Sequence, residues 1–517
     1  MRALRWMALS AAVRASRKAA PRRRSLWAFA FCLLGACGGA ASDSKDDTNS
    51  PEPPVPIVSI TSHSEGQRVL GSRQVTVSGL LEDVSALGSV QVLHNGAEVT
   101  ATVVDQAFSF GLTLGNGSNT IQVVASNSAG TSNSRTLTLF YPYLSLGNLQ
   151  DAQRVIGQPD FSSKSKPNPP TAASVGALYG SPAFADGVYY FPDYENDRVL
   201  GYLSDPKDNG AAADFVLGQP DLTTRSQATS PTGMANPQGL AVGEDRLFAV
   251  DYSNRRILIW NSLPKTTGTP ASLVLGAPDL STPGTGDCSA TSFLYPSEVL
   301  VADGKLIVVD DGHHRVLIWN AIPTVNNVPA DVVLGQQTFT RCAENDDDQN
   351  NAVDAAPSAR TLRWPSGAWS DGTRLFVSDG NNNRILIWNQ VPTSHFAPAD
   401  GVLGQPNFTT AVGQASKGGL DYPAQITSNG NQLFVADLDN HRVLVWNAVP
   451  TTSQTHPDVV LGQLSFTTNA SHDVEGDGTG STTPSAKTFY YPSGLAVNDL
   501  GLWVTDQTPR FLYFAGQ

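Results

Sequence analysis

A segment recurs at intervals of about 60 residues along the last three quarters of the chain, and this period constrains the fold more than any other feature. Each copy has an Asp, an Asn three residues later and an Arg five residues later, followed by an apolar stretch that ends in Trp-Asn. Residues 251–261, 379–389 and 437–447 are three clear copies. A period of this size indicates one supersecondary unit that is repeated in a closed or stacked array.

Four strands are predicted in each repeat unit. In the second unit the first strand follows Pro237, the second spans residues 246–250, the third follows the Asp-Asn-Arg turn, and the fourth ends at the Gly of a Val-Leu-Gly segment. The glycines of this kind lie at positions 157, 218, 276, 335, 404 and 462. Third strands such as 385–388 are apolar at every position, which is typical of strands covered on both faces. Six units of four strands predict an all-β chain with a six-bladed β-propeller over residues 144–517.

The two ends of the array predict that the ring is closed by its own first segment. Residues 153–157 have the pattern of a fourth strand without three strands before it, and the last unit has three strands without a fourth. Pairing this first segment with residues 511–514 would complete the sixth blade and hide both sheet edges.

The turn Asp-x-x-Asn-x-Arg, followed by Ile or Val, resembles that of the NHL-repeat family of β-propellers, and the resemblance covers residues 144–517. Three units depart from the pattern. The third has His313 in place of Asn, the sixth is one residue shorter between Asp506 and Arg510, and the first lacks the Trp. The resemblance implies a propeller fold but names no ligand, because propellers host many unrelated activities.

The repeated Asp and Arg are interpreted as structural pairs. They stand at the two ends of a tight turn, where a planar guanidinium can hold a carboxylate through two parallel hydrogen bonds. Because the pair recurs in every blade, we expect it to serve the fold, whereas catalysis needs asymmetry. The expected pairs are Asp193–Arg198, Asp251–Arg256, Asp310–Arg315, Asp379–Arg384, Asp437–Arg442 and Asp506–Arg510.

Residues 57–142 have a different pattern, which predicts a small β-sandwich of about seven strands. Apolar and polar residues alternate over 75–78 and 108–114, and Asn95-Gly96 favours a tight hairpin turn. The run Leu-x-x-Gly-x-Asn-x-Ile-x-Val-x-Ala resembles bacterial Ig-like modules of secreted proteins. Such a module serves as a spacer or binds a carbohydrate or protein partner, and the sequence leaves both roles open.

Residues 1–36 are typical of an export signal, with a basic start and a short apolar stretch. The sequence Leu-Gly-Ala-Cys that ends at Cys37 resembles the bacterial lipobox, which implies lipidation of Cys37 and anchoring in the cell envelope. By resemblance to enterobacterial sorting rules, Gly38 in place of Asp does not favour retention in the inner membrane, so we expect the outer membrane. The alternative is a plain secretory signal with a chance cysteine. Residues 37–56 are rich in Pro, Gly, Ser and Asp and predict a flexible tether.

The charge of the chain excludes some partners. It has 33 basic and 46 acidic residues, and eight basic residues but no acidic ones lie in the first 36. The remainder therefore has 25 basic and 46 acidic residues, a formal charge of −21. We expect such a surface to repel nucleic acid, and a cationic ligand is electrostatically easier to bind.

The links between the fourth strand of one unit and the first strand of the next differ most between units. They contain two groups of acidic residues that could hold calcium through oxygen ligands or could be solvated loops. These are Asp346, Asp347 and Asp348 in one link, and Asp473 and Asp477 in another. Cys288 and Cys342 lie on successive links, where a disulfide or two free buried thiols are both compatible with the sequence.

Three functions remain open, one of them that of a purely structural envelope protein. The favoured one is a non-enzymatic, monomeric lipoprotein whose propeller presents a rigid platform for a protein, peptide or glycan, with no cofactor. The alternative is a metal-dependent hydrolase or lyase at the mouth of the central channel. There Glu298 and Gln425 replace the Gly of a repeated Pro-x-Gly, and the resemblance to six-bladed lyases and lactonases makes Glu298 a candidate metal ligand.

Overall fold

The computed structural model describes residues 52–475 and 477–517. The expected leader, Cys37 and nearly all of the expected tether lie outside the described residues. The described chain consists of strands, 3₁₀ turns and loops, and none of its helices is long and apolar enough to cross a membrane. The prediction of an all-β fold is confirmed.

Residues 57–141 form an Ig-like sandwich of two sheets, with strand orders β1-β3-β7-β6 and β2-β9-β8-β4-β5. The elements are β1 (Ile57–Ile60), β2 (Gln67–Arg68), β3 (Gln74–Glu82), η1 (Val84–Ala86), β4 (Leu87–His94), β5 (Ala97–Val99), β6 (Thr102–Val104), β7 (Ala107–Thr113), β8 (Gly117–Asn127) and β9 (Ser132–Tyr141).

The sandwich has nine strands rather than the seven expected, because β2, β5 and β6 are too short to show an alternating pattern. Alternation holds in the long strands. In β3, Val77 and Leu81 are buried in the shared core while Thr76 and Leu80 are exposed. Asn95 and Gly96 both have positive φ, as the expected hairpin turn requires.

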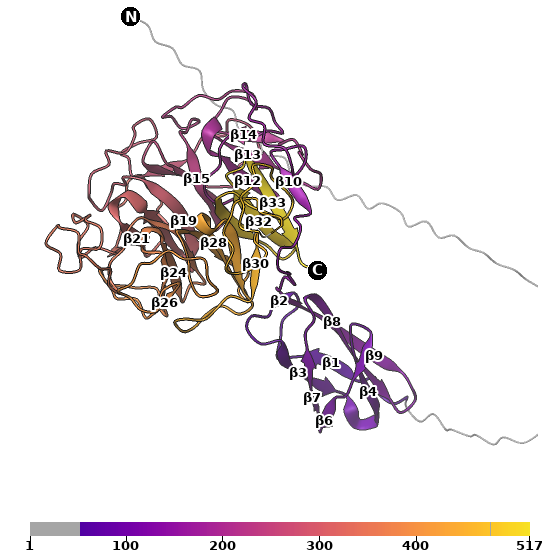
Figure 1. Cartoon of the computed structure of the whole chain (residues 1–517). Helices are drawn as coiled ribbons and strands as arrows, with labels where there is room; N and C mark the ends of the chain where they lie inside the picture. The colour runs from indigo at the N-terminus through magenta and orange to yellow at the C-terminus, as the bar shows by residue number, and fades with distance from the viewer. Residues whose placement is uncertain (1–51, 476) are drawn as a thin grey trace, which may run out of the picture. The chain divides into compact units, whose positions relative to one another are not determined.

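Six four-stranded antiparallel sheets form the propeller (Figure 1). We number the blades by the order of their Asp–Arg turns. Blade 1 has β11 (Ala183–Ala185), β12 (Val188–Asp193), β13 (Arg198–Tyr202) and β14 (Phe215–Leu217). Blade 2 has β15 (Pro237–Gly243), β16 (Arg246–Asp251), β17 (Arg256–Trp260) and β18 (Leu273–Leu275). Blade 3 has β19 (Pro296–Ala302), β20 (Lys305–Asp310), β21 (Arg315–Trp319) and β22 (Val332–Leu334).

The other three blades repeat this order. Blade 4 has β23 (Pro365–Ser370), β24 (Leu375–Asp379), β25 (Arg384–Trp388) and β26 (Gly401–Leu403). Blade 5 has β27 (Pro423–Ser428), β28 (Leu433–Asp437), β29 (Arg442–Trp446) and β30 (Val459–Leu461). Blade 6 has β31 (Pro492–Val497), β32 (Gly501–Asp506), β33 (Arg510–Ala515) and β10 (Arg154–Ile156). The 3₁₀ turns between second and third strands are η2 (Tyr194–Asn196), η3 (Asp311–His313), η4 (Gly380–Asn382) and η5 (Leu438–Asn440).

The first propeller strand closes the ring. β10 pairs antiparallel with β33, with Arg154 opposite Tyr513 and Ile156 opposite Phe511. In Figure 1 the purple β10 accordingly lies beside the yellow β33. The two ends of the propeller are thus held in one sheet by backbone hydrogen bonds.

The hydrophobic cores of the propeller lie between neighbouring blades. The third strands β17, β21, β25 and β29 are buried at every residue. One cluster joins Ile307 and Val309 of blade 3 to Leu386 and Trp388 of blade 4. Each fully buried side chain of this size contributes about 1.5–3 kcal/mol to folding. This two-sided burial explains why the third strands are apolar throughout.

The repeated Trp also has a polar role. Its Nε1–H donates to the carbonyl nine residues later in the link to the fourth strand, at 2.9–3.1 Å. These bonds join Trp260 to Thr269, Trp319 to Val328, Trp388 to Ala397 and Trp446 to Thr455. Blade 1 lacks the Trp, but the Tyr202 hydroxyl donates to Ala211 O at the same spacing and 3.1 Å. In the first five blades this position therefore has a large side chain with one donor, whereas blade 6 has Phe514, which has none.

Antiparallel order places the links on two faces. The turns from second to third strands and the links from fourth to first strands share one face, which we call the turn face. The links from third to fourth strands lie on the opposite face. The opposite-face links are twelve residues long in every case, at 203–214, 261–272, 320–331, 389–400 and 447–458. The turn-face links vary from 19 residues, at 218–236, to 30 residues, at 335–364.

Candidate functional site

All six expected Asp–Arg pairs form, and all twelve side chains are completely buried. In each pair the Arg Nε donates to the Asp Oδ2 at 2.6–2.9 Å. Every pair joins the end of a second strand to the start of a third strand, so the pairs themselves single out no blade as a site.

The prediction of two parallel hydrogen bonds is wrong for all six pairs, since Arg510, which donates from both Nε and Nη2, reaches only the Oδ2 atom of Asp506. The other guanidinium groups donate from Nη1 and Nη2 to backbone carbonyls of the turn-face links. Arg315 bonds the carbonyl oxygens of Phe339, at 2.8 Å, and of Ser292, at 2.8 Å. Each Arg therefore fixes two links as well as its own turn.

Burial and charge compete at the paired carboxyl groups. Burial raises the pKa of Asp251 to about 6, although the Arg256 charge and hydrogen bonds oppose the rise. At Asp310 burial is outweighed by the hydrogen bond from His313 and the charge of Arg315, and the pKa lies below its ordinary value. His313, which replaces the usual Asn, lies 2.8 Å from Asp310 Oδ2 through its Nδ1. It thus serves the turn.

A disulfide joins Cys288 and Cys342, with their Cα atoms 6.3 Å apart. It ties the turn-face link before blade 3 to the link before blade 4. Together with the Arg bonds it holds these long links in place without regular secondary structure.

The acidic links differ in how their carboxylates are arranged. Oxygen atoms of Asp346, Asp348 and Asp354 lie within 4.8 Å of one another, the one such group among the described residues. Asp347 is not part of it, since its Oδ1 accepts a hydrogen bond from Ser358 Oγ at 2.6 Å.

In the other acidic link, Asp473 accepts from the backbone of Gly478 at 2.9 Å and Asp477 from that of Thr479 at 2.8 Å. These bonds organise the loop itself. Calcium therefore remains an expectation of the sequence alone.

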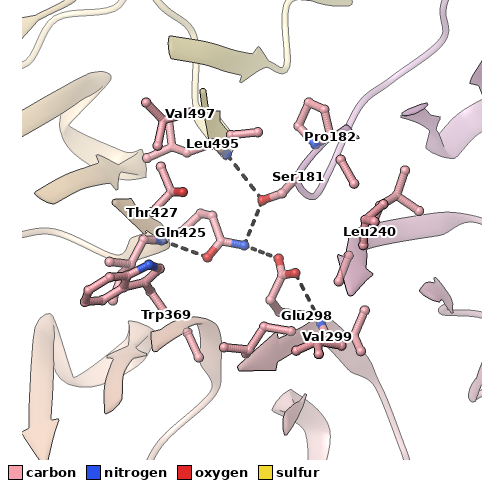
Figure 2. A pocket seen from close by; sticks show the side chains of 18 of the residues that line it. Ser181, Pro182, Leu240, Glu298, Val299, Trp369, Gln425, Thr427, Leu495 and Val497 are labelled. Atoms are coloured by element: carbon pink, nitrogen blue, oxygen red, sulfur yellow. Dashed lines mark hydrogen bonds between the residues drawn. The ribbon is translucent and has the colours of Figure 1, made fainter. Parts of the chain in front are cut away.

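The central channel is crossed by a hydrogen-bonded network of three side chains from alternate blades (Figure 2). Gln425 Nε2 donates to Glu298 Oε2 and, at 2.8 Å, to Ser181 Oγ. Glu298 Oε1 accepts from the backbone of Val299 at 3.1 Å, and Ser181 Oγ from that of Leu495 at 3.3 Å. We call Ser181, Glu298 and Gln425 the channel plug.

Glycines of blades 2 and 4 make room for the plug. A Cβ atom on Gly239 would lie 2.7 Å from Glu298 Oε1, and one on Gly367 would lie 2.4 Å from Gln425 Oε1. The two replacements of Gly noted in the sequence are therefore compatible only with glycine in the neighbouring blades.

Glu298 is 4% exposed. Burial raises its pKa to about 8, against the lowering effect of its hydrogen bonds with Val299, Gln425 and Ser181. Its nearest polar partners are thus an amide, a hydroxyl and a backbone N–H, and its carboxyl is protonated at neutral pH.

The plug lies between two cavities of the channel. One, of about 250 Å³, is lined by first-strand residues toward the opposite face. The other, of about 260 Å³, opens on the turn face, and we call it the turn-side cavity. Glu298 and Gln425 line both. The aromatic residues of the turn-side cavity are Tyr179, Tyr252, Trp364 and Tyr422.

Tyrosine rings continue around the mouth of the turn-side cavity. The ring centroids of Tyr179 and Tyr194 are 4.8 Å apart, those of Tyr194 and Tyr252 6.1 Å, and those of Tyr252 and Tyr295 5.4 Å. One carboxyl, that of Asp311, interrupts this aromatic wall. It belongs to η3, directly after Asp310, where blades 1 and 2 have Tyr194 and Tyr252.

Sequence analysis missed this cavity. Two signals could have indicated it. One is an aromatic residue directly before the Pro that begins a first strand, at Tyr295, Trp364, Tyr422 and Tyr491. The other is the difference among units in the residue after the paired Asp, where only the third unit has an acid.

Comparison with known proteins extends this description. Residues 56–143 match the family model described as glucodextranase, domain B. NHL repeat-containing protein 2 of Bos taurus is 24% identical over 312 residues, which cover 56% of this chain and 40% of that protein. The chain thus spans less than half the length of this relative.

Two solved structures are similar to this chain at low identity. A nidogen/laminin complex chain is 15% identical with a TM-score of 0.32, covering 72% of this chain and 97% of that one. The PQQ-bound aldose sugar dehydrogenase of Streptomyces coelicolor is 15% identical with a TM-score of 0.36, covering 66% and 95%. These low identities and TM-scores support no inference about the function of this chain. By sequence, the chain is similar to an NHL-repeat protein, and its N-terminal sandwich is similar to domain B of glucodextranase.

Proposed function

We propose that this protein is a lipoprotein of the bacterial cell envelope whose propeller binds a partner through its turn face. One observation carries the proposal: the five opposite-face links have one length, whereas the turn-face links vary in length and sequence. A surface whose links differ from blade to blade in both length and sequence has more ways to match an asymmetric partner than a surface whose links all have one length.

The turn face is also built to be rigid. Buried guanidinium groups and the Cys288–Cys342 disulfide fix its links before any partner arrives. Fixed loops lose little conformational entropy on binding, which favours affinity. The lipobox-like sequence ending at Cys37 supports the anchor, and the similarity to an NHL-repeat protein supports a role in interaction.

Capture of the partner on intact cells tests the proposal. The protein is cross-linked, purified and compared with two variants that each place a charge on an exposed valine. Val412, 64% exposed, lies in a turn-face link, and Val325, 61% exposed, lies in an opposite-face link. We expect Val412→Glu to reduce capture and Val325→Glu to leave it unchanged. Equal capture by both variants would exclude the turn face around Val412.

The anchor has a separate test. Cys37→Ser should abolish labelling of the protein by palmitate in growing cells. Labelling that persists in this variant would show that Cys37 is not the lipidated residue.

A further inference from the structure

We infer that the turn-side cavity binds a protonated amine, with its ammonium group on Asp311 and its alkyl chain among the aromatic rings. The inference rests on the proposed function, since it gives the chemistry that the turn face recognises. It is carried by three features of the cavity: its unpaired acceptors, its carboxyl groups without a basic neighbour in the lining, and its aromatic wall.

Two polar atoms of the cavity wall lack partners. Asp311 Oδ1 and Ser297 Oγ are both buried, and neither has a hydrogen bond within the described part of the chain. A buried polar group without a partner is costly, so native proteins satisfy nearly all of them. Both atoms can accept a hydrogen bond, and a ligand that donates would satisfy them.

The ionisable groups that line the cavity restrict the kind of ligand further. Two carboxyl groups, of Asp311 and Glu298, line the cavity, and its described lining residues include no Lys, Arg or His. Burial and the neighbouring Asp310 raise the pKa of Asp311 well above its ordinary range. A cation would offset this cost and restore the ionised carboxylate. An ammonium group fits best, because it has three donors and no acceptor.

The aromatic wall suits the same ligand. Tyr252 and Trp364 both line the cavity, and a cation close to the face of a Trp or Tyr ring is attracted by the ring quadrupole. The rings also shield an alkyl chain from water. A volume of about 260 Å³ lies just below the range of roughly 300–1,000 Å³ that is usual for drug-sized ligands, so the cavity admits one side chain or a small molecule.

The amine has two possible sources, a free small molecule or a lysine side chain of the partner. Both present the same group to Asp311. The structure selects the chemistry, and the experiment below separates the sources.

Isothermal titration calorimetry of the full-length protein at low salt tests the inference, with n-butylamine and n-butanol as probes. The two probes share an alkyl chain, and only the amine is charged. We expect butylamine to bind at least about tenfold more tightly than butanol, as the loss of one charged hydrogen bond implies. Equal affinities, or no binding of butylamine, would overturn the inference without any variant.

Two variants with the same change of charge locate the site. Asp311→Asn should weaken butylamine binding about ten- to hundredfold and leave butanol unchanged. Asp439→Asn is the matched control, because Asp439 lies in η5 but does not line the cavity. Wild-type affinity in Asp311→Asn, or an equal loss in both variants, would refute the role of Asp311.

Capture on cells then separates the sources and the two proposals. If Asp311→Asn loses both butylamine and the cross-linked partner, the amine is a lysine of the partner. If it loses butylamine alone, the amine is a free molecule. Unchanged capture by Val412→Glu would count against the proposed function, whatever the result of the calorimetry. The calorimetry tests the amine site independently of the partner.

Discussion

Replacing Glu298 with Gln should stabilise the propeller at high pH and have little effect at low pH. The folded-state pKa of Glu298 is raised to about 8 from 4.5, because the side chain is buried in the channel plug. The folded state then holds the proton more tightly than the unfolded state. Stability from this group is fully present below pH 4.5 and is lost as the pH rises through about 8.

The size of the effect follows from linkage. One pKa unit corresponds to about 1.36 kcal/mol, so the raised pKa costs the wild-type protein about 4 kcal/mol between pH 5 and pH 9. No discount for solvent applies, since the side chain is buried. Gln cannot accept from both Gln425 Nε2 and the Val299 N–H as the carboxyl does, which subtracts about 1 kcal/mol at every pH. The predicted signature is therefore a slope with pH rather than an offset.

Guanidinium denaturation followed by Trp fluorescence measures this slope. Every Trp outside the expected leader lies in the propeller, so fluorescence reports on that domain alone. We expect the free energy of unfolding of Glu298→Gln, minus that of the wild type, to rise by about 4 kcal/mol from pH 5 to pH 9. Glu244→Gln, at an exposed glutamate of β15–β16, should show no such rise. A difference for Glu298→Gln that stays flat with pH would refute a protonated carboxyl in the plug.

Four further substitutions, at three positions, test the contacts that support the blades and links. Arg384→Lys should lower the free energy of unfolding by about 3–5 kcal/mol, because one ammonium group cannot replace the Nε and both Nη groups of a buried pair. Denaturation curves measure this loss, and a loss below about 1 kcal/mol would contradict the prediction. Trp388→Phe should lower the free energy of unfolding by about 1–3 kcal/mol more than its smaller buried area accounts for, because it leaves a carbonyl group unpaired. Trp388→Tyr, whose hydroxyl can donate, should recover part of this loss. Cys342→Ser should destabilise by about 2–4 kcal/mol and speed proteolysis of residues 335–364, and unchanged cleavage would show that the disulfide does not order this link.

Repetition is what made the fold predictable from sequence. A residue required once per blade appears six times, so even altered copies can be recognised. The His at position 313 still bonds its Asp, and Tyr202 makes the bond of the missing Trp. The closing strand could be predicted for the same reason, since its Val-Ile-Gly pattern matches the other fourth strands.

Interactions with the backbone could not be predicted in this way. The Nη groups of Arg315 bond the carbonyl oxygens of Phe339 and Ser292, and a carbonyl has no sequence signature. The simple expectation of a bidentate pair followed from the two side chains alone. It failed because the links supply competing acceptors at a point where only the three-dimensional fold places them.

The turn-side cavity was missed because it belongs to no single repeat. Asp311 stands beside the paired Asp310 and has the pattern of an ordinary turn residue. Its unpaired oxygen becomes evident only when the ring brings Tyr252 and Trp364 to the same cavity. Asymmetry that arises between blades is therefore invisible to an analysis that compares each blade with the next.

The plug shows how six similar units produce an axis with a lower symmetry. Positions with and without a side chain alternate around the channel. The positions with a side chain are Ser181, Glu298 and Gln425, and the glycine positions are Gly239, Gly367 and Gly494. Since Glu298 and Gln425 line both cavities and bond each other between them, the turn-side cavity ends at the plug. A ligand must therefore enter and leave through the turn face. Recognition by this channel is then decided by the residues of the turn face, where the links differ in length and sequence, and not by the links on the opposite face.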